Sequence, residues 1–324
     1  MNLLYGIFFA LIIAIPAHFL GKAFPIIGGP VFGILLGMLI ASFKRPSFLE
    51  SGIKFTGKKI LQYSIILLGF EMNLHNVLNV GFQSLSVMIF TLATAFISAL
   101  ILGKLLKLDS NTTLLIGGGT AICGGSAIAA IAPVIGAKDK EVAFSISTIF
   151  LFNILAVFIF PALGHLMNLS DTGFGMWAGT AINDTSSVVA AGYSYSLAAG
   201  DYATIVKLTR ALMIVPICII LAMITAKKNA QAGEFSIAKI FPMFILWFVV
   251  ASIVNTINIL PIELSKFLGN TGKFCIVLAM TAIGLNTNIK QLISNGIRPI
   301  ILGLICWFAV AIVSLIVQYS IGLI

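Results

Sequence analysis

The residues whose types could do chemistry gather in two short polar segments, each set between apolar stretches of the chain. The first, residues 117–126, reads Gly-Gly-Gly-Thr-Ala-Ile-Cys-Gly-Gly-Ser and contains five glycines. Glycine costs roughly 1 kcal/mol relative to alanine inside a helix, so this run predicts an interrupted helix. A new half-helix would begin near its end, where free N–H groups and the helix dipole favour an anion. We expect ligand contacts from Thr120, Cys123, Gly124, Gly125 and Ser126. The alternative is a tight helix crossing built from small residues.

The second polar segment, residues 179–187, reads Gly-Thr-Ala-Ile-Asn-Asp-Thr-Ser-Ser and repeats the Gly-Thr-Ala-Ile of residues 119–122. An ionisable residue inside an apolar span is costly, which makes Asp184 a functional-site hypothesis. We expect this carboxylate to bind a cation or carry a proton, as the coupling group of the site. The neighbouring polar residues could contact the ligand or cap a half-helix: Asn183, Thr185 and Ser186. The alternative is an external loop in which Asp184 only caps the next helix.

Two basic residues, Lys207 and Arg210, lie within a further apolar stretch. Their spacing of three places both on one face of a helix. A guanidinium inside a membrane must be paired or face water, and it suits a carboxylate, sulfate or phosphate. We expect both residues to bind the anion. The alternatives are that Lys207 extends to the membrane interface and that Arg210 forms a buried ion pair with Asp184.

A weaker echo pairs residues 69–74 with residues 284–289, and it contains Glu71. We expect Glu71 to take part in ion or proton coupling, or else to satisfy a helix end. The three histidines lack the spacing of metal ligands, and the chain has no Walker A, HExxH or GxSxG motif. The sequence therefore predicts a protein that is not an enzyme and has neither metal nor cofactor, with H⁺ or Na⁺ as the coupling ion.

Composition decides which elements must position these residues. The chain has 324 residues, of which 60% are hydrophobic and 9% charged, whereas soluble domains carry about 25% charged residues. An ordinary soluble enzyme and a nucleic-acid binder are therefore excluded. A spanning helix needs about 20 mostly apolar residues. We expect an all-α transmembrane bundle, one integral domain over 1–324, from eleven apolar segments near 3–20, 24–42, 58–72, 84–104, 112–136, 142–164, 173–192, 201–225, 237–258, 272–287 and 299–322.

The echoes predict two related halves, approximately 1–162 and 163–324, arranged as inverted repeats with paired broken helices at the membrane midplane. The segments 112–136 and 173–192 carry the breaks, and each either spans the membrane or re-enters it. If all eleven segments cross, Lys and Arg are more numerous in loops on the N-terminal side, which places the N-terminus in the cytoplasm. Such a bundle in the lipid bilayer could also form a homodimer.

The two polar segments also carry a family resemblance. Residues 119–135, Gly-Thr-Ala-Ile-Cys-Gly-Gly-Ser-Ala-Ile-Ala-Ala-Ile-Ala-Pro-Val-Ile, resemble a signature of the bacterial YeiH family, described as sulfate exporters. Residues 179–191 resemble the other signature region of that family, and the likeness covers essentially the full chain. The resemblance implies a multi-pass protein of the bacterial cytoplasmic membrane.

Residues and resemblance together predict a secondary active transporter of a small inorganic anion, sulfate or a related oxyanion. Its transport would be coupled to protons or Na⁺ by alternating access. One alternative is a cation/proton antiporter that uses Asn183 and Asp184 as its ion site. A less favoured alternative is a membrane scaffold that transports nothing.

Overall fold

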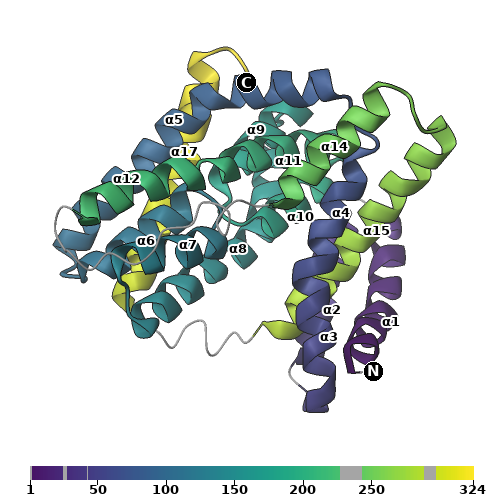
Figure 1. The fold of residues 1–324 in the computed structure, drawn as a ribbon, viewed down its shortest axis with the longest axis horizontal. Coiled ribbons are helices and arrows are strands. Elements are labelled where there is room, and N and C mark those ends of the chain that lie inside the picture. The colour runs from purple at the N-terminus through teal and green to yellow at the C-terminus, as the bar shows by residue number, and fades with distance from the viewer. Residues whose placement is uncertain (1, 25–27, 42, 227–242, 288–296) are drawn as a thin grey trace.

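The computed structural model describes residues 2–24, 28–41, 43–226, 243–287 and 297–324, and every regular element in these ranges is helical (Figure 1). The predicted all-helical membrane bundle is confirmed. The elements are α1 (Asn2–Ala23), α2 (Gly29–Ala41), η1 (Ser47–Leu49), α3 (Glu50–Phe55), η2 (Thr56–Ile60), α4 (Leu61–Gly69), α5 (Leu74–Leu105), α6 (Ser110–Ala121), α7 (Gly125–Ile135), α8 (Asp139–Leu166), α9 (Asp171–Ala181), α10 (Thr185–Tyr195), α11 (Leu197–Leu212), α12 (Ile214–Ala226), α14 (Met243–Thr256), α15 (Ile262–Asn286) and α17 (Ile297–Ser320).

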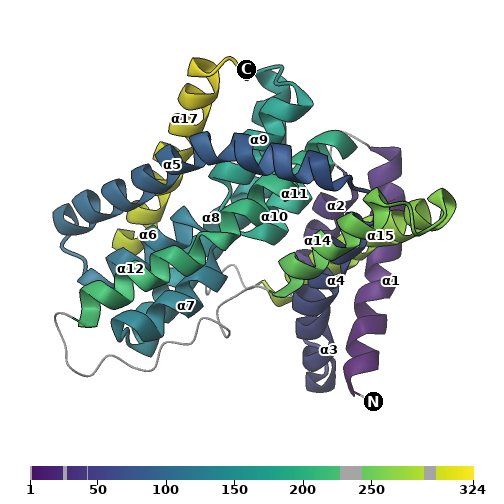
Figure 2. The ribbon, with the colours of Figure 1, turned by 45° about the horizontal axis from the view of Figure 1, so that its top comes forward.

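The helices form two groups that lie side by side in both ribbon views (Figures 1 and 2). The small bundle consists of α1–α4, α14 and α15, and the large bundle consists of α5–α12 and α17. Glycines allow α2 and α15 to pack closely, because a Cβ on Gly284 would lie 2.4 Å from the carbonyl oxygen of Ile34. Gly284, which belongs to the echo of residues 284–289, therefore serves helix packing.

The described parts of the predicted apolar segments lie largely on helices, but three segments begin eight to ten residues too late. The segment predicted at 84–104 is α5, which begins at Leu74. The segment predicted at 58–72 is a continuous run of α3, η2 and α4 from Glu50 to Gly69, and the one predicted at 272–287 is α15. The latter two helices carry charged residues in their first turns, such as Glu50 and Glu263. These charges lower the local hydropathy, so a prediction based on hydropathy places the start of each helix too late. Residues 237–242 of the ninth segment lie outside the described residues. Six described helices are long and apolar enough to cross a membrane.

The first broken segment, α6 and α7, is a hairpin whose two ends lie together. Near its base, the Asn111 Nδ2 donates to the Glu141 Oε2 at 3.0 Å. Along its length, a Cβ on Gly118 would lie 2.4 Å from the Cδ1 of Ile131, so the two half-helices run side by side in opposite directions. The chain therefore enters and leaves this hairpin on the same side of the bundle. Of the two alternatives for residues 112–136, spanning or re-entrant, the segment is re-entrant.

The second broken segment, α9 and α10, is also a hairpin. The rings of Phe174 and Tyr195 stack with centroids 3.9 Å apart, and the Ser196 hydroxyl donates to the Asp171 Oδ1 at 2.6 Å. The 28-residue helix α8 connects the base of one hairpin to the base of the other. The hairpins consequently enter the large bundle from opposite ends.

We name these ends after the chain termini nearest to them. The N-side is the end at which α1 begins. The end of α15 also lies there, beside Arg45, which donates to the carbonyl oxygen of Leu285 at 2.6 Å. The C-side is where the chain ends, and a Cβ on Gly173 would lie 2.4 Å from Ile324. The α6–α7 hairpin enters from the N-side and the α9–α10 hairpin from the C-side (Figure 1).

Candidate functional site

The tips of the two hairpins meet inside the large bundle. The first tip, residues 122–124, ends α6 and begins α7, and the second, residues 182–184, ends α9 and begins α10. Gly124 has a φ of 67°, a backbone conformation that residues with a side chain rarely adopt. A Cβ at this position would lie 3.4 Å from the Cβ of Asp184. The turn therefore requires the glycine, whereas the contact between the tips is at an ordinary van der Waals distance.

Two cations from α11 occupy the carbonyl ends of α6 and α9. The Lys207 Nζ donates to the carbonyl oxygens of Ile122 at 2.7 Å and Ile182 at 3.1 Å. The Arg210 Nε donates to the carbonyl oxygen of Ala121 at 2.6 Å, and another guanidinium nitrogen donates to that of Thr120 at 2.5 Å. A helix C-terminus leaves unpaired carbonyls and partial negative charge, so two buried cations are stabilised there.

This arrangement explains why Lys and Arg occur in an apolar helix. Both side chains are fully buried, with 0% exposure, so Lys207 does not reach the interface. Among the described residues Arg210 forms no ion pair with Asp184, because its hydrogen bonds go to main-chain carbonyls. The two cations join the hairpins to α11 and so fix the tips.

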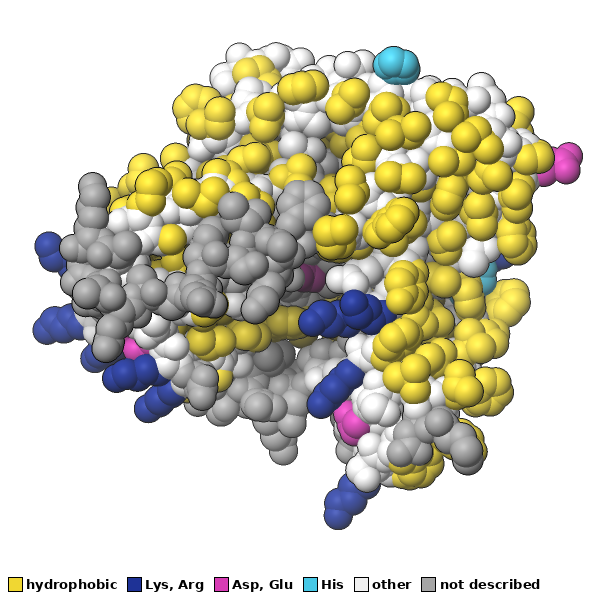
Figure 3. Space-filling model, in the orientation of Figure 1, with side chains coloured by type: hydrophobic (Ala, Val, Ile, Leu, Met, Phe, Trp, Pro, Cys, Tyr) yellow, Lys and Arg dark blue, Asp and Glu magenta, His cyan; other side chains and the backbone are white. Residues whose placement is uncertain are grey.

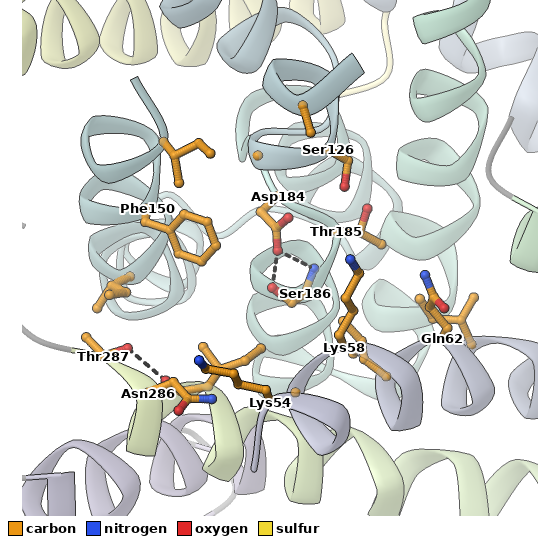
Figure 4. A pocket seen from close by; sticks show the side chains of 18 of the residues that line it. Lys54, Lys58, Gln62, Ser126, Phe150, Asp184, Thr185, Ser186, Asn286 and Thr287 are labelled. Atoms are coloured by element: carbon orange, nitrogen blue, oxygen red, sulfur yellow. Dashed lines mark hydrogen bonds between the residues drawn. The ribbon is translucent and has the colours of Figure 1, made fainter. Parts of the chain in front are cut away.

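The amino ends of α7 and α10 face a cavity of about 710 Å³ that lies between the two bundles. Gly125 and Ser126 of α7 line it together with Asp184, Thr185 and Ser186 of α10 (Figure 4). The Asp184 carboxylate caps α10, since it accepts a hydrogen bond from the Ser186 N–H at 2.9 Å and another from the Ser186 hydroxyl. Two half-helix dipoles therefore direct their positive ends into one cavity.

The small bundle supplies the opposite wall of the cavity. Lys54, Lys58 and Gln62 recur every four residues along α3, η2 and α4, which places them on one helix face. Lys58 and Gln62 extend toward the α10 tip, and Lys54 extends toward the end of α15 (Figure 4). In the space-filling view, Lys and Arg side chains lie at the edge of a hollow between the bundles (Figure 3).

The predicted site residues fall into three places. Five line the cavity: Gly125, Ser126, Asp184, Thr185 and Ser186. Six lie buried in the tips or directly behind them: Thr120, Cys123, Gly124, Asn183, Lys207 and Arg210. Glu71 lies near the C-side, where its Oε2 is 2.7 Å from the Nζ of Lys273, and it does not line the cavity.

Sequence reasoning missed the wall that the small bundle contributes. In the sequence, Lys54 and Lys58 count among the basic residues that predict membrane orientation, and no motif contains Gln62 or Thr287. The four-residue spacing of Lys54, Lys58 and Gln62 is a signal that could have found them. Their position against the hairpin tips depends on the packing of two bundles, which no local pattern reveals.

Comparisons with known proteins agree with the sequence motifs. The family described as conserved hypothetical protein 698 matches residues 5–303. The UPF0324 membrane protein of Fusobacterium nucleatum subsp. nucleatum is 47% identical, over 99% of this chain and 99% of that protein. Another UPF0324 membrane protein, from Streptococcus pyogenes serotype M3, is 51% identical over 98% of this chain and 97% of that protein.

A solved structure, the sodium proton antiporter MjNhaP1 from Methanocaldococcus jannaschii, aligns with 99% of this chain and 97% of its own, at 14% identity and a TM-score of 0.31. The membrane-protein relatives and the long apolar helices together show a multi-pass membrane protein. The chain belongs to the conserved hypothetical protein 698 family, the UPF0324 membrane proteins, which is the YeiH family that its two polar segments resemble.

Proposed function

We propose that the protein is a secondary transporter of a small anion, sulfate or a related oxyanion, which binds at the hairpin tips. The observation that carries this proposal is the cavity itself. The amino ends of two half-helices face Lys54 and Lys58 across it. Helix amino ends and ammonium groups are the partners that oxyanions prefer in proteins.

The charges that line the cavity favour an anion. Lys54 and Lys58 contribute two positive charges and Asp184 contributes one negative charge. Each helix amino end adds roughly half a positive elementary charge. An oxyanion could also accept hydrogen bonds from the hydroxyls of Ser126 and Thr185. The negative charge of Asp184 gives a proton or Na⁺ a place to bind beside the anion, which would couple the two movements.

The shape of the molecule suits alternating access. Lys54, Asn286 and Thr287 line the cavity toward the N-side. On the C-side, α10 packs against α2 and α15, and a Cβ on Gly28 would lie 2.7 Å from the Cα of Ser194. Transport would require the two bundles to separate at this contact while they close at the N-side.

Counterflow of labelled sulfate in proteoliposomes tests the proposal. We expect saturable accumulation, and we expect Lys58→Gln and Lys54→Gln to weaken the apparent affinity about tenfold, or about 1.4 kcal/mol. Lys59→Gln is the matched control, because Lys59 is exposed on the same helix but does not line the cavity. Equal loss in all three variants, or no saturable accumulation, would overturn the anion site.

A cation/proton antiporter is the second candidate, and two observations favour it. Arg210 and Lys207 are committed to main-chain carbonyls, which leaves Asp184 as the ionisable group at the tips that faces the cavity. The side-chain amide of Asn183 is buried and has no hydrogen-bond partner among the described residues. Dissipation of a pH gradient by Na⁺ or K⁺ in the same vesicles, without sulfate accumulation, would favour this function.

A further inference from the structure

Much of the cavity wall beyond the hairpin tips is apolar. Ile146, Phe150 and Ile154 of α8 line it, and their spacing of four places them in one stripe along the helix. Leu61 and Ile65 of α4 line it from the small bundle. The cavity therefore has an apolar surface on α8, interrupted by Ser147, and apolar side chains beside Lys58 and Gln62 on the opposite wall.

This apolar surface begins next to the predicted anion position. A Cβ on Gly125 would lie 3.3 Å from the Cε2 of Phe150, so the aromatic ring lies against the amino end of α7. The ring and the helix end both face the cavity, and Figure 4 shows Phe150 on the opposite side of Asp184 from Lys58. A ligand held at the α7 amino end would therefore have an apolar wall directly beside it.

An inorganic oxyanion would use only part of this site. The volume of about 710 Å³ lies within the range of pockets, about 300–1,000 Å³, that enclose organic ligands between mostly apolar walls. Sulfate has no apolar surface with which to cover Phe150 or the α8 stripe. An organic anion of the same head-group chemistry would bury its carbon atoms there and gain the hydrophobic contribution.

We infer that the preferred cargo is an organic anion, with an oxyanion head group at the hairpin tips and an apolar body of several carbons against α8. This inference rests on the proposed anion site and names the class of its substrate. The head group would bind the amino ends of α7 and α10 together with Lys58. The body would contact Ile146, Phe150 and Ile154.

A series of ligands with one head group tests the inference. The protein in lipid nanodiscs would be unfolded thermally, with tryptophan fluorescence as the signal, in inorganic sulfate and in methyl, propyl and pentyl sulfate. Binding to the native state raises the unfolding temperature according to affinity. We expect affinity to rise about fourfold for each buried methylene. A protein of unrelated fold in the same nanodiscs corrects for partition of the ligands into lipid.

Two variants connect the effect to the α8 stripe. Phe150→Ala and Ile154→Ala should flatten the rise of affinity with chain length, so that pentyl sulfate loses much more affinity than inorganic sulfate does. Leu155→Ala is the control, because Leu155 is 38% exposed on the outer surface of the same helix and does not line the cavity. Either variant alone suffices if the other does not fold.

The outcomes separate the inference from the function on which it rests. Equal stabilisation by sulfate and all alkyl sulfates would overturn the organic cargo and leave the anion site standing. A rise with chain length that persists in both variants would overturn the assignment to α8. An absence of stabilisation by every anion, sulfate included, would overturn the inference together with the proposed function.

Discussion

At the scale of single residues, the structure assigns different tasks to charges that look alike in the sequence. Arg210 and Lys207 donate to the carbonyl ends of α6 and α9, whereas Lys54 and Lys58 line the cavity. The residue types and the helix-face spacing could be predicted from the sequence. Which cations contact main-chain carbonyls and which line the cavity could not be predicted, because this depends on how helices distant in sequence pack.

The role of Arg210 gives the first prediction. Arg210→Ala should lower the free energy of unfolding by about 2–5 kcal/mol, because buried carbonyls of two hairpins lose their donor. Thermal unfolding in detergent measures the effect, and Lys58→Ala, at an exposed position, should change it little. Unfolding of Arg210→Ala at the wild-type temperature would contradict this role.

The carboxylate of Asp184 gives the second prediction. Asp184→Asn keeps an acceptor for the Ser186 N–H, and Asn caps helices about as well as Asp, so stability should change by less than about 1 kcal/mol. The charge is lost, so sulfate flux should no longer respond to a proton or Na⁺ gradient. Flux of this variant is measured with and without each gradient. An unchanged response would assign coupling to another group.

At the scale of elements, the sequence predicts where the two helices are interrupted, but it does not predict how the chain continues after each interruption. Five glycines in residues 117–126 and the repeated Gly-Thr-Ala-Ile are local signals, and both lie where a helix ends. Whether the chain then continues across or turns back is decided elsewhere, by contacts such as Asn111 with Glu141 at the hairpin base. Two half-helices of 12 and 11 residues are compatible both with a chain that crosses the membrane and with one that turns back.

The turn at Gly124 gives an element-scale prediction. Gly124→Ala should cost about 1–3 kcal/mol of stability, because alanine must adopt a φ of 67° that glycine adopts freely. Gly125→Ala is the matched neighbour, since Gly125 begins α7 and has no positive φ. Thermal unfolding of the two variants should separate them, and equal unfolding temperatures would contradict a turn that depends on glycine.

At the scale of the whole molecule, the hairpins strengthen the charge asymmetry between the two ends. Because α6–α7 re-enters, Lys138 and Lys140 lie on the N-side instead of the opposite side, where eleven crossings would place them. The described basic residues at the C-side are Lys22, Lys266 and Lys273. Those at the N-side are Lys44, Arg45, Lys54, Lys58, Lys59, Lys104, Lys107, Lys138, Lys140 and Arg298. Cytoplasmic loops collect Lys and Arg, so the N-side should face the cytoplasm.

Thiol labelling tests this orientation. Thr287→Cys, which lines the cavity toward the N-side, should react with a membrane-impermeant maleimide in inside-out vesicles and stay unlabelled in intact cells. Cys275, partly exposed in the wild type, is replaced by Ser in this background. Labelling from the cell exterior would reverse the orientation.

The central claim, that an anion occupies the hairpin tips, is tested most directly by protection of a thiol placed there. Ser126 is exposed at the amino end of α7 and lines the cavity. The measurement is the alkylation rate of Ser126→Cys in a background without other cysteines, with increasing sulfate and with chloride as the ionic-strength control. We predict saturable slowing by sulfate that requires about tenfold more sulfate when Lys58→Gln is added. An alkylation rate that no anion changes would contradict the site.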